Sequence, residues 1–348
     1  TASWGRGRGG KIEVLGRIEY PHSLGFLWEE ITEHLGFRRN NDEGTVMALA
    51  AYGDAKCMND KLRRLARPLD DGTFFVDHRL ARFRAQDGRG LEELLGPRRR
   101  GGDRLRYEGA DRRHADIAAA LQDLTEEILI GLARRVRIET GLANLAIAGG
   151  VALNCCANSR LARDRIFDEM WVVPAANDAG TAFGAAAVAW ADRHGTAPRR
   201  QWRHAFFGAP DPQDAVDRAI ESRGLAGQRM AQRPLIEHIA RLLSAGKIVA
   251  WYESPSEVGP RALGHRSILA DPTRPDMKDR LNLRVKHRLP FRPFGPIVRA
   301  EDAGRFFDMP PGAPGPARFM LMAVRVRDAV KDRLPAILHA DGTTRPQL

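Results

Sequence analysis

The chain has 348 residues, a formal net charge of +11 and an apolar content of 43%, which is ordinary for a globular protein. This length exceeds what one average hydrophobic core organises, so we expect about two domains. No apolar run approaches the ~20 residues that cross a bilayer, which excludes a membrane-spanning helix. The three cysteines form no disulfide or zinc pattern, which favours a reduced, cytoplasmic protein without membrane partners.

The ends of the sequence and its charge set further expectations. The sequence begins with Thr1 and ends at Leu348 just after a polar stretch, so we interpret it as a fragment of a longer protein. Arginine clusters occur at residues 98–100 and 199–200, but there is no aromatic-interleaved basic helix and no DNA-reading motif. Nucleic acid is therefore not the expected partner. We attribute most of the positive charge to a general bias toward arginine. Binding of anionic substrates would explain the remainder.

The first half predicts an extended segment followed by helices. Residues 12–18 are extended, and an apolar helical pattern over 26–35 ends at Gly36. A short strand is predicted over 73–76. A long amphipathic helix follows, because Ile, Leu and Val recur at helical spacing between 117 and 136.

The middle of the chain predicts an α/β unit. Residues 145–148 are expected to form a short buried strand that runs into two glycines and a new helix. Residues 170–174 predict a second buried strand, followed by a small-residue helix over 181–191. The segment 195–212 is rich in proline, glycine, arginine and tryptophan, which is typical of a domain boundary. We therefore divide the chain into domains 1–198 and 199–348.

The first candidate site is the turn Gly149-Gly150 with Asn154. A strand that ends in glycines and starts a helix exposes backbone N–H groups to an anion, although such glycines also serve simply to pack a helix on a strand. Asp178 follows the second strand at the edge where α/β proteins bind ligands. It is interpreted either as a metal ligand or as a helix cap.

The second candidate site spans residues 258–299, where cations alternate with stiffening prolines and apolar side chains. Its cations are Arg261, Arg266, Lys286, Arg288, Arg292 and Arg299. Arginine grips phosphate or carboxylate with two parallel hydrogen bonds, and this pattern favours a folded anion pocket over a solvated basic face. Ser267 has no base in its neighbourhood, so we expect its hydroxyl to bind phosphate and not to act as a nucleophile.

Taken in order, the motifs resemble one family. The matching segments are 21–25, 43–50, 149–154, 178–186, 258–272, 285–288, 291–294 and 339–345, together with Asn282. The run at 258–272 reads Val-Gly-Pro-Arg-Ala-Leu-Gly-His-Arg-Ser-Ile-Leu-Ala-Asp-Pro. The chain is similar to the O-carbamoyltransferases that modify nodulation factors, aminoglycosides and cephamycins.

The resemblance implies an α/β fold in two incomplete domains. Residues 1–198 would belong to an actin-like domain (the ASKHA class), as in the machinery that transfers threonylcarbamoyl to tRNA. Residues 199–348 would belong to a YrdC-like domain that makes a carbamoyl-adenylate. The implied reactants are ATP as co-substrate, carbamoyl phosphate and a small-molecule hydroxyl acceptor, with Fe(II) or another divalent metal at the transfer site. A homo-oligomer is one possible assembly of the protein.

The resemblance also assigns roles to individual residues. Lys286, Arg292 and Arg345 match the catalytic, adenylate-forming pocket, and Asp178 matches a metal ligand. Nucleotide- or substrate-binding roles fall to Gly149, Gly150, Asn154, Arg261, Arg266, Ser267 and Arg288. The family's paired-histidine metal motif would lie upstream of this chain.

Two alternatives stay open. One alternative to the carbamoyltransferase is a relative that modifies tRNA with a threonylcarbamoyl-type group. The other is a catalytically incomplete remnant that binds nucleotide. The presence of both kinds of domain in one chain favours the carbamoyltransferase.

Overall fold

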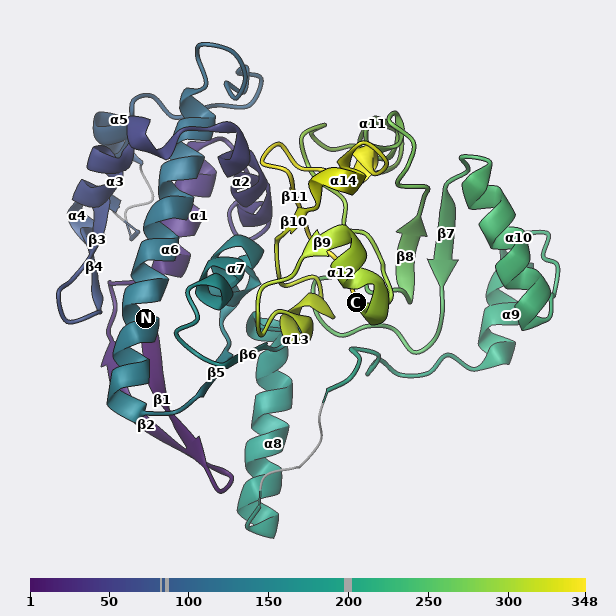
Figure 1. Cartoon of the computed structure of the whole chain (residues 1–348), viewed down its shortest axis with the longest axis horizontal. Helices are drawn as coiled ribbons and strands as arrows, with labels where there is room; N and C mark the ends of the chain where they lie inside the picture. The colour runs from purple at the N-terminus through teal and green to yellow at the C-terminus, as the bar shows by residue number, and fades with distance from the viewer. Residues whose placement is uncertain (82, 85–87, 197–201) are drawn as a thin grey trace.

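The computed structural model describes residues 1–81, 83–84, 88–196 and 202–348. The predicted boundary between residues 198 and 199 lies outside these described residues, as does the arginine pair at 199–200. Helices alternate with small sheets, which confirms the α/β class. Figure 1 shows the N-terminal half gathered around helix α6 (Arg113–Thr140), with the C-terminal segments on the far side of α7 (Cys155–Arg163).

The N-terminal elements begin with an antiparallel hairpin and continue through short helices into one long helix. Their bounds are β1 Ala2–Arg8, β2 Lys11–Ile18, α1 Leu24–His34, α2 Glu43–Leu49, α3 Asn59–Leu65, β3 Ala66–Pro68, β4 Phe74–Val76, α4 His78–Ala81, α5 Arg89–Leu95 and α6 Arg113–Thr140. The extended start, the first helix and the strand near residue 74 are therefore confirmed.

Helix α6 organises the first half because one of its faces is continuously apolar. Ile117, Leu121 and Ile128 are fully buried on this face, as the spacing in the sequence predicts. The helix ends where Gly141 adopts a left-handed conformation with φ of 65°, and its N–H bonds the carbonyl of Arg137. Helices α2, α3 and α7 contact α6.

The predicted strand–helix–strand unit is present. Strand β5 (Asn144–Ile147) pairs in parallel with β6 (Glu169–Val172), and α7 (Cys155–Arg163) connects them. The expectation of a buried first strand is wrong, because Ala146 is exposed and its neighbours are only partly covered. Among the described strands, β5 pairs with β6 alone, so its outer edge and one face lie open.

Helix α8 (Thr181–His194) follows β6 as predicted. Figure 1 shows it projecting from the end of β6 away from the other helices. None of its residues is buried, and Trp190 is 51% exposed.

Apart from two longer helices, the C-terminal elements are short and are separated by loops. Their bounds are α9 Gln213–Ser222, α10 Gln232–Ser244, β7 Val249–Tyr252, β8 Arg266–Leu269, α11 Met277–Arg280, a π-helical turn Leu281–Val285, α12 Ala303–Phe306, β9 Phe307–Asp308, α13 Pro314–Ala317, β10 Val324–Val326, α14 Asp328–Lys331 and β11 Thr343–Thr344. Strands β7 and β8 form an antiparallel pair, and β10 lies between β9 and β11. In the part of the chain that the structure describes, no helix is long and apolar enough to span a bilayer.

Two large hydrophobic cores each combine both halves of the chain. The first core surrounds α1, α2 and α6 and also contains Phe291. The second core joins α7 and β6 to C-terminal residues that include Phe307, Phe319 and Val324. Burial of these side chains against one another places the motifs of both halves at a common junction.

Candidate functional site

Four arginines from three separate segments meet at the junction of the two halves. We name Arg261, Arg288, Arg292 and Arg345 the arginine cluster. Burial together with the positive charge of Arg345 lowers the pKa of Arg261 to about 9. Burial together with the charges of Arg292 and Arg345 lowers the pKa of Arg288 to about 10. Burial also lowers the pKa of Arg292, with Arg345 again adding to the effect. The fold therefore holds like charges close together, and this arrangement favours a bound anion.

Asn282 holds two members of the cluster in place. It is fully buried in the π-helical turn, and its Nδ2 donates to the carbonyls of Pro290 and Arg292 at 3.1 and 3.0 Å. Its Oδ1 accepts a hydrogen bond of 2.7 Å from Arg288 Nε. The Arg288 guanidinium also lies 4.6 Å from the ring centroid of Phe294. One buried amide thus fixes the loop that carries Arg288 and Arg292.

Arg261 and Arg345 are positioned by backbone contacts. A terminal nitrogen of Arg261 donates to the carbonyl of Leu153 at 3.1 Å, which ties this arginine to the turn before α7. The carbonyl of Arg345 passes so close to Gly295 that a Cβ there would lie 2.4 Å from it. Glycine is required at this position because only a residue without a side chain lets the two segments approach. The Nε atoms of Arg261 and Arg345 are buried and have no hydrogen-bond partner among the described residues.

Two groups oppose the positive charge of the cluster. Asp42, which lies just before α2, acts electrostatically on Arg292. Cys155, the first residue of α7, is buried, and its pKa is lowered because the Cys156 thiol donates a hydrogen bond to it and Arg345 and Arg261 lie nearby. Two weak counter-charges against four guanidinium groups leave the cluster positive.

The motif at 258–272 is only partly available for binding. Arg266 is bound to the buried Glu257, with Nε 2.7 Å from Oε2. The Ser267 hydroxyl is buried and accepts a hydrogen bond from the Gly264 N–H at 3.0 Å. Of the motif's three predicted binding residues, the structure brings Arg261 alone into the arginine cluster.

The predicted glycine turn follows β5, but the N–H of Gly149 and the side chain of Asn154 are both engaged within the fold. Gly149 has φ of 103° and its N–H bonds the carbonyl of Ala176, whereas Gly150 begins a 3-10 turn over Gly150–Leu153. Both glycines are exposed. Asn154 is buried, caps α7 through the N–H of Ala157 and exchanges two hydrogen bonds with Gln122.

Lys286 and Asp178 make none of the contacts described above. Lys286 is exposed and is not among the charges that shift the pKa values of the cluster. Asp178 is exposed in the turn Asp178–Gly180 after β6. Across the described ranges, no three His, Cys, Asp or Glu side chains are grouped to hold a metal ion. These residues do not make a metal site by themselves, so Asp178 as a ligand stays a prediction.

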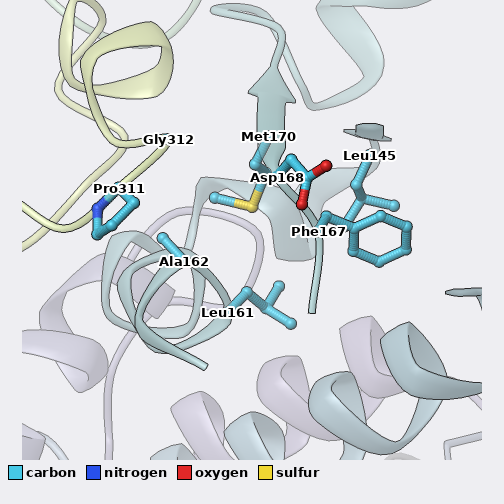
Figure 2. Close-up of a pocket in the computed structure, with 8 residues that line it drawn as sticks. All are labelled: Leu145, Leu161, Ala162, Phe167, Asp168, Met170, Pro311 and Gly312. Atoms are coloured by element: carbon cyan, nitrogen blue, oxygen red, sulfur yellow. The ribbon is translucent and has the colours of Figure 1, made fainter. Parts of the chain in front are cut away.

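A small cavity lies elsewhere, between β6, α7 and the loop with Pro311 and Gly312 (Figure 2). Leu161, Met170 and Phe167 line it, and its volume is about 10 Å³. This is space for about one water molecule. The cavity is too small for a substrate and contains no member of the arginine cluster.

Sequence reasoning missed Cys155, Asp42 and the structural role of Asn282. Cys155 directly follows the Gly149–Asn154 motif, and its position at the start of a helix was the available signal. Asp42 gave no such signal, because its effect on Arg292 depends on how distant segments pack.

Comparison with known proteins finds two family models that match separate parts of the chain. Residues 2–187 match the family model described as "Carbamoyltransferase N-terminus", and residues 240–348 match "Carbamoyltransferase C-terminus". The nodulation protein NolO of Bradyrhizobium diazoefficiens is 36% identical over 98% of this chain and 60% of its own length. The nodulation protein NolNO of Sinorhizobium fredii is 35% identical over 98% of this chain and 48% of its own length. An uncharacterized protein of Synechocystis is 34% identical over 100% of this chain and 60% of its own length. The chain thus spans about half to three fifths of the length of these relatives.

Proposed function

Since the chain belongs to the carbamoyltransferase family, we propose that it is part of an enzyme that transfers a carbamoyl group to a hydroxyl of a sugar or natural-product acceptor. The arginine cluster is the observation that supports this proposal. A carbamoyl donor activated by phosphate is anionic, and partly desolvated guanidinium groups stabilise such charge more strongly than they do in water. The proposed fold is an actin-like part followed by a YrdC-like part.

The proposed chemistry has two stages. Carbamoyl phosphate reacts with water to give carbamate and phosphate, and a carbamate oxygen then attacks the α-phosphorus of ATP. The bond from that phosphorus to the β-phosphate oxygen breaks, so pyrophosphate leaves and carbamoyl-adenylate remains. The acceptor hydroxyl then attacks the carbamoyl carbon, AMP leaves, and the hydroxyl proton passes to solvent.

The arginine cluster fits the first stage because two anionic reactants repel each other until fixed cations neutralise them. Arg292 and Arg345 would contact the phosphates, with Arg261 and Arg288 beside them. Lys286 is exposed and would have to turn toward the reactants. The glycine turn would hold a nucleotide through the N–H of Gly150, because the N–H of Gly149 already bonds the carbonyl of Ala176. Asp178 remains the proposed ligand for Fe(II) or another divalent metal.

Pyrophosphate release tests the proposal. The full-length protein is incubated with ATP and carbamoyl phosphate, and pyrophosphate is measured for the wild type, Arg292→Ala and the control Arg284→Ala. Arg284 is exposed in the same π-helical turn and lies outside the arginine cluster. We expect Arg292→Ala to slow release by about 100-fold, the loss typical of a removed charge-stabilising donor, and Arg284→Ala to leave it unchanged. Wild-type release by Arg292→Ala would overturn the proposed role of the cluster.

A further inference from the structure

A second basic site lies in the N-terminal half. A cavity of about 440 Å³ opens between the end of α1 and the loop that follows α5, and it is lined by Gly36, Phe37, Glu92, Arg98, Arg99, Arg100 and Gly101. None of these residues belongs to the arginine cluster. Figure 1 shows α5 at the outer side of α6, whereas β8, β10 and α11 lie on its other side.

The arginines of this cavity are held by different contacts. Arg99 donates to the carbonyls of Leu35 and Gly36, both at 3.1 Å, and its guanidinium lies 5.2 Å from the Phe37 ring centroid. It therefore caps the carbonyl end of α1, and Asp103 of the same loop is the acid that acts on it electrostatically. Arg98 is paired with Glu33 at 2.8 Å. Arg100 is exposed, and its guanidinium makes no hydrogen bond or ion pair with any residue that the structure describes.

The surroundings of the cavity are also positive. Arg113 donates to the carbonyl of Pro97 at 2.9 Å, so its charge lies next to the same loop. His34 and His114 are both buried close by, and the pKa of each is lowered to about 4, first by burial and then by Arg113. Both imidazoles are therefore neutral at physiological pH. Glu92 is the one acid among the lining residues, and one of its oxygens already accepts from the N–H of Arg98.

We propose that this cavity is a binding site for the phosphate group of a small molecule, separate from the arginine cluster. Arg100 supplies an unpaired guanidinium at the mouth, and Arg99 supplies a charge that the α1 carbonyls fix in position. Guanidinium groups in such an arrangement bind phosphate with paired, charge-assisted hydrogen bonds. The Phe37 ring offers an apolar wall for the rest of the ligand. This site is independent of the proposed transfer reaction.

The test uses variants that leave the fold intact. Arg100→Gln removes the unpaired charge, and Arg104→Gln removes an equal charge from an exposed position of the same loop that does not line the cavity. Gly101→Glu places a carboxylate at the cavity, and a Cβ there meets nothing within 4 Å. Gly101→Gln is its neutral control of similar size.

Binding of pyrophosphate and of inorganic phosphate to the full-length protein is measured by calorimetry at low salt. Site-resolved evidence comes from protection of arginines against phenylglyoxal, with the modified peptides identified by mass spectrometry. We expect pyrophosphate to protect Arg100 but not Arg104. We also expect Arg100→Gln to weaken the binding seen at this site by about tenfold and Gly101→Glu to abolish it, since one charge-assisted contact is lost or reversed.

Two results would overturn the proposal. One is equal loss of binding in Arg100→Gln and Arg104→Gln, because that would show general screening and no site. The other is protection of Arg292 or Arg345 alone, because that would place all of the bound phosphate at the arginine cluster. ATP and carbamoyl phosphate are then compared with pyrophosphate to decide whether a nucleotide or a simple phosphate is the better ligand. Arg292→Ala leaves protection of Arg100 intact if the two sites are independent.

Discussion

Glu257 and Arg266 form a closed ion pair in which Arg266 Nε lies 2.7 Å from Glu257 Oε2 and an Arg266 terminal nitrogen donates to the Glu257 carbonyl at 2.8 Å. The other carboxylate oxygen accepts the N–H groups of Leu263, His265 and Arg266. Burial opposes the charge, but the Arg266 guanidinium and these N–H groups hold the pKa of Glu257 at about 2. The carboxylate therefore organises the loop of the 258–272 motif.

Replacing this carboxylate is expected to destabilise the protein. Glu257→Gln leaves Arg266 without its charge partner and puts an amide where three N–H groups converge, so we expect a loss of about 3 kcal/mol in the free energy of unfolding. Urea denaturation at pH 7 measures this. The matched control is Glu253→Gln on the exposed side of the same loop, which we expect to change stability by less than about 0.5 kcal/mol. Equal effects of the two variants would contradict the structural role of Glu257.

The buried side chain of Asn282 acts both as a donor and as an acceptor, and one substitution removes only the donor. Asn282→Asp keeps the oxygen that accepts from Arg288 but loses the Nδ2 group that donates to Pro290 and Arg292. We expect a loss of stability of about 1–3 kcal/mol, since two carbonyls lose a buried donor. Pyrophosphate release should slow as well, because the loop carrying Arg292 is no longer fixed. Unchanged release at normal stability would show that Asn282 does not position this arginine.

Replacing Cys155 is expected to strengthen anion binding at the arginine cluster. The pKa of its thiol is lowered by the hydrogen bond from Cys156 and by Arg345 and Arg261, so Cys155 carries negative charge beside the cluster as pH rises. Cys155→Ser removes that charge while keeping a side chain of similar shape. We expect pyrophosphate to bind to the arginine cluster about two- to fivefold more tightly at pH 8. Cys57→Ser is the control because Cys57 is exposed and is not among the groups that shift the pKa values of the cluster. Weaker binding in Cys155→Ser would show that the thiol itself contacts the anion.

His34 and His114 predict a loss of stability in mild acid. Burial, followed by the charge of Arg113, lowers the pKa of each from 6.5 to about 4. The unfolded chain therefore binds more protons than the folded chain between these two values, and stability falls as pH decreases through this window. For His34 alone we expect a loss of about 2 kcal/mol between pH 7 and pH 5.

His34→Leu tests this pH dependence, because leucine fills a similar volume without a titrating group. Urea denaturation at pH 7 and pH 5 should show a smaller difference for His34→Leu than for the wild type. His238→Leu on exposed helix α10 provides the control. A pH dependence equal to that of the wild type would mean that His34 is already protonated in the folded protein.

Substitution of glycine by alanine is expected to change stability in opposite directions at Gly53 and Gly44. A Cβ on Gly53 would lie 2.1 Å from the carbonyl oxygen of Ala115 on α6, so Gly53→Ala should cost about 2–3 kcal/mol through forced backbone shifts. A Cβ on Gly44 in α2 meets nothing within 4 Å, so Gly44→Ala should stabilise the helix by about 0.5–1 kcal/mol. Thermal unfolding of the two variants measures both effects. A destabilised Gly44→Ala would contradict the open surroundings of that position.

Local sequence pattern determined several of the main elements and the family. Helix α6 follows from helical spacing that ends at Gly141, and the β5–α7–β6 unit follows from two short apolar runs joined by a glycine turn. The ordered motifs indicated the carbamoyltransferase family, which the family models confirm. These features are local because each depends on a few neighbouring residues and on the order in which they occur.

Only the tertiary structure decided which cations remain available to bind an anion. Arg261 and Arg266 lie in one motif, yet Arg266 is bound to Glu257 whereas Arg261 joins the cluster with Arg345. The sequence also predicted that β5 is buried, and this prediction was wrong because burial depends on which elements pack over the strand. Electrostatic energy is a sum over all neighbouring charges, and those neighbours come from distant segments such as the one that carries Asp42. The spacing of residues along the chain does not contain these distances, so the fold alone sets the charge of the site.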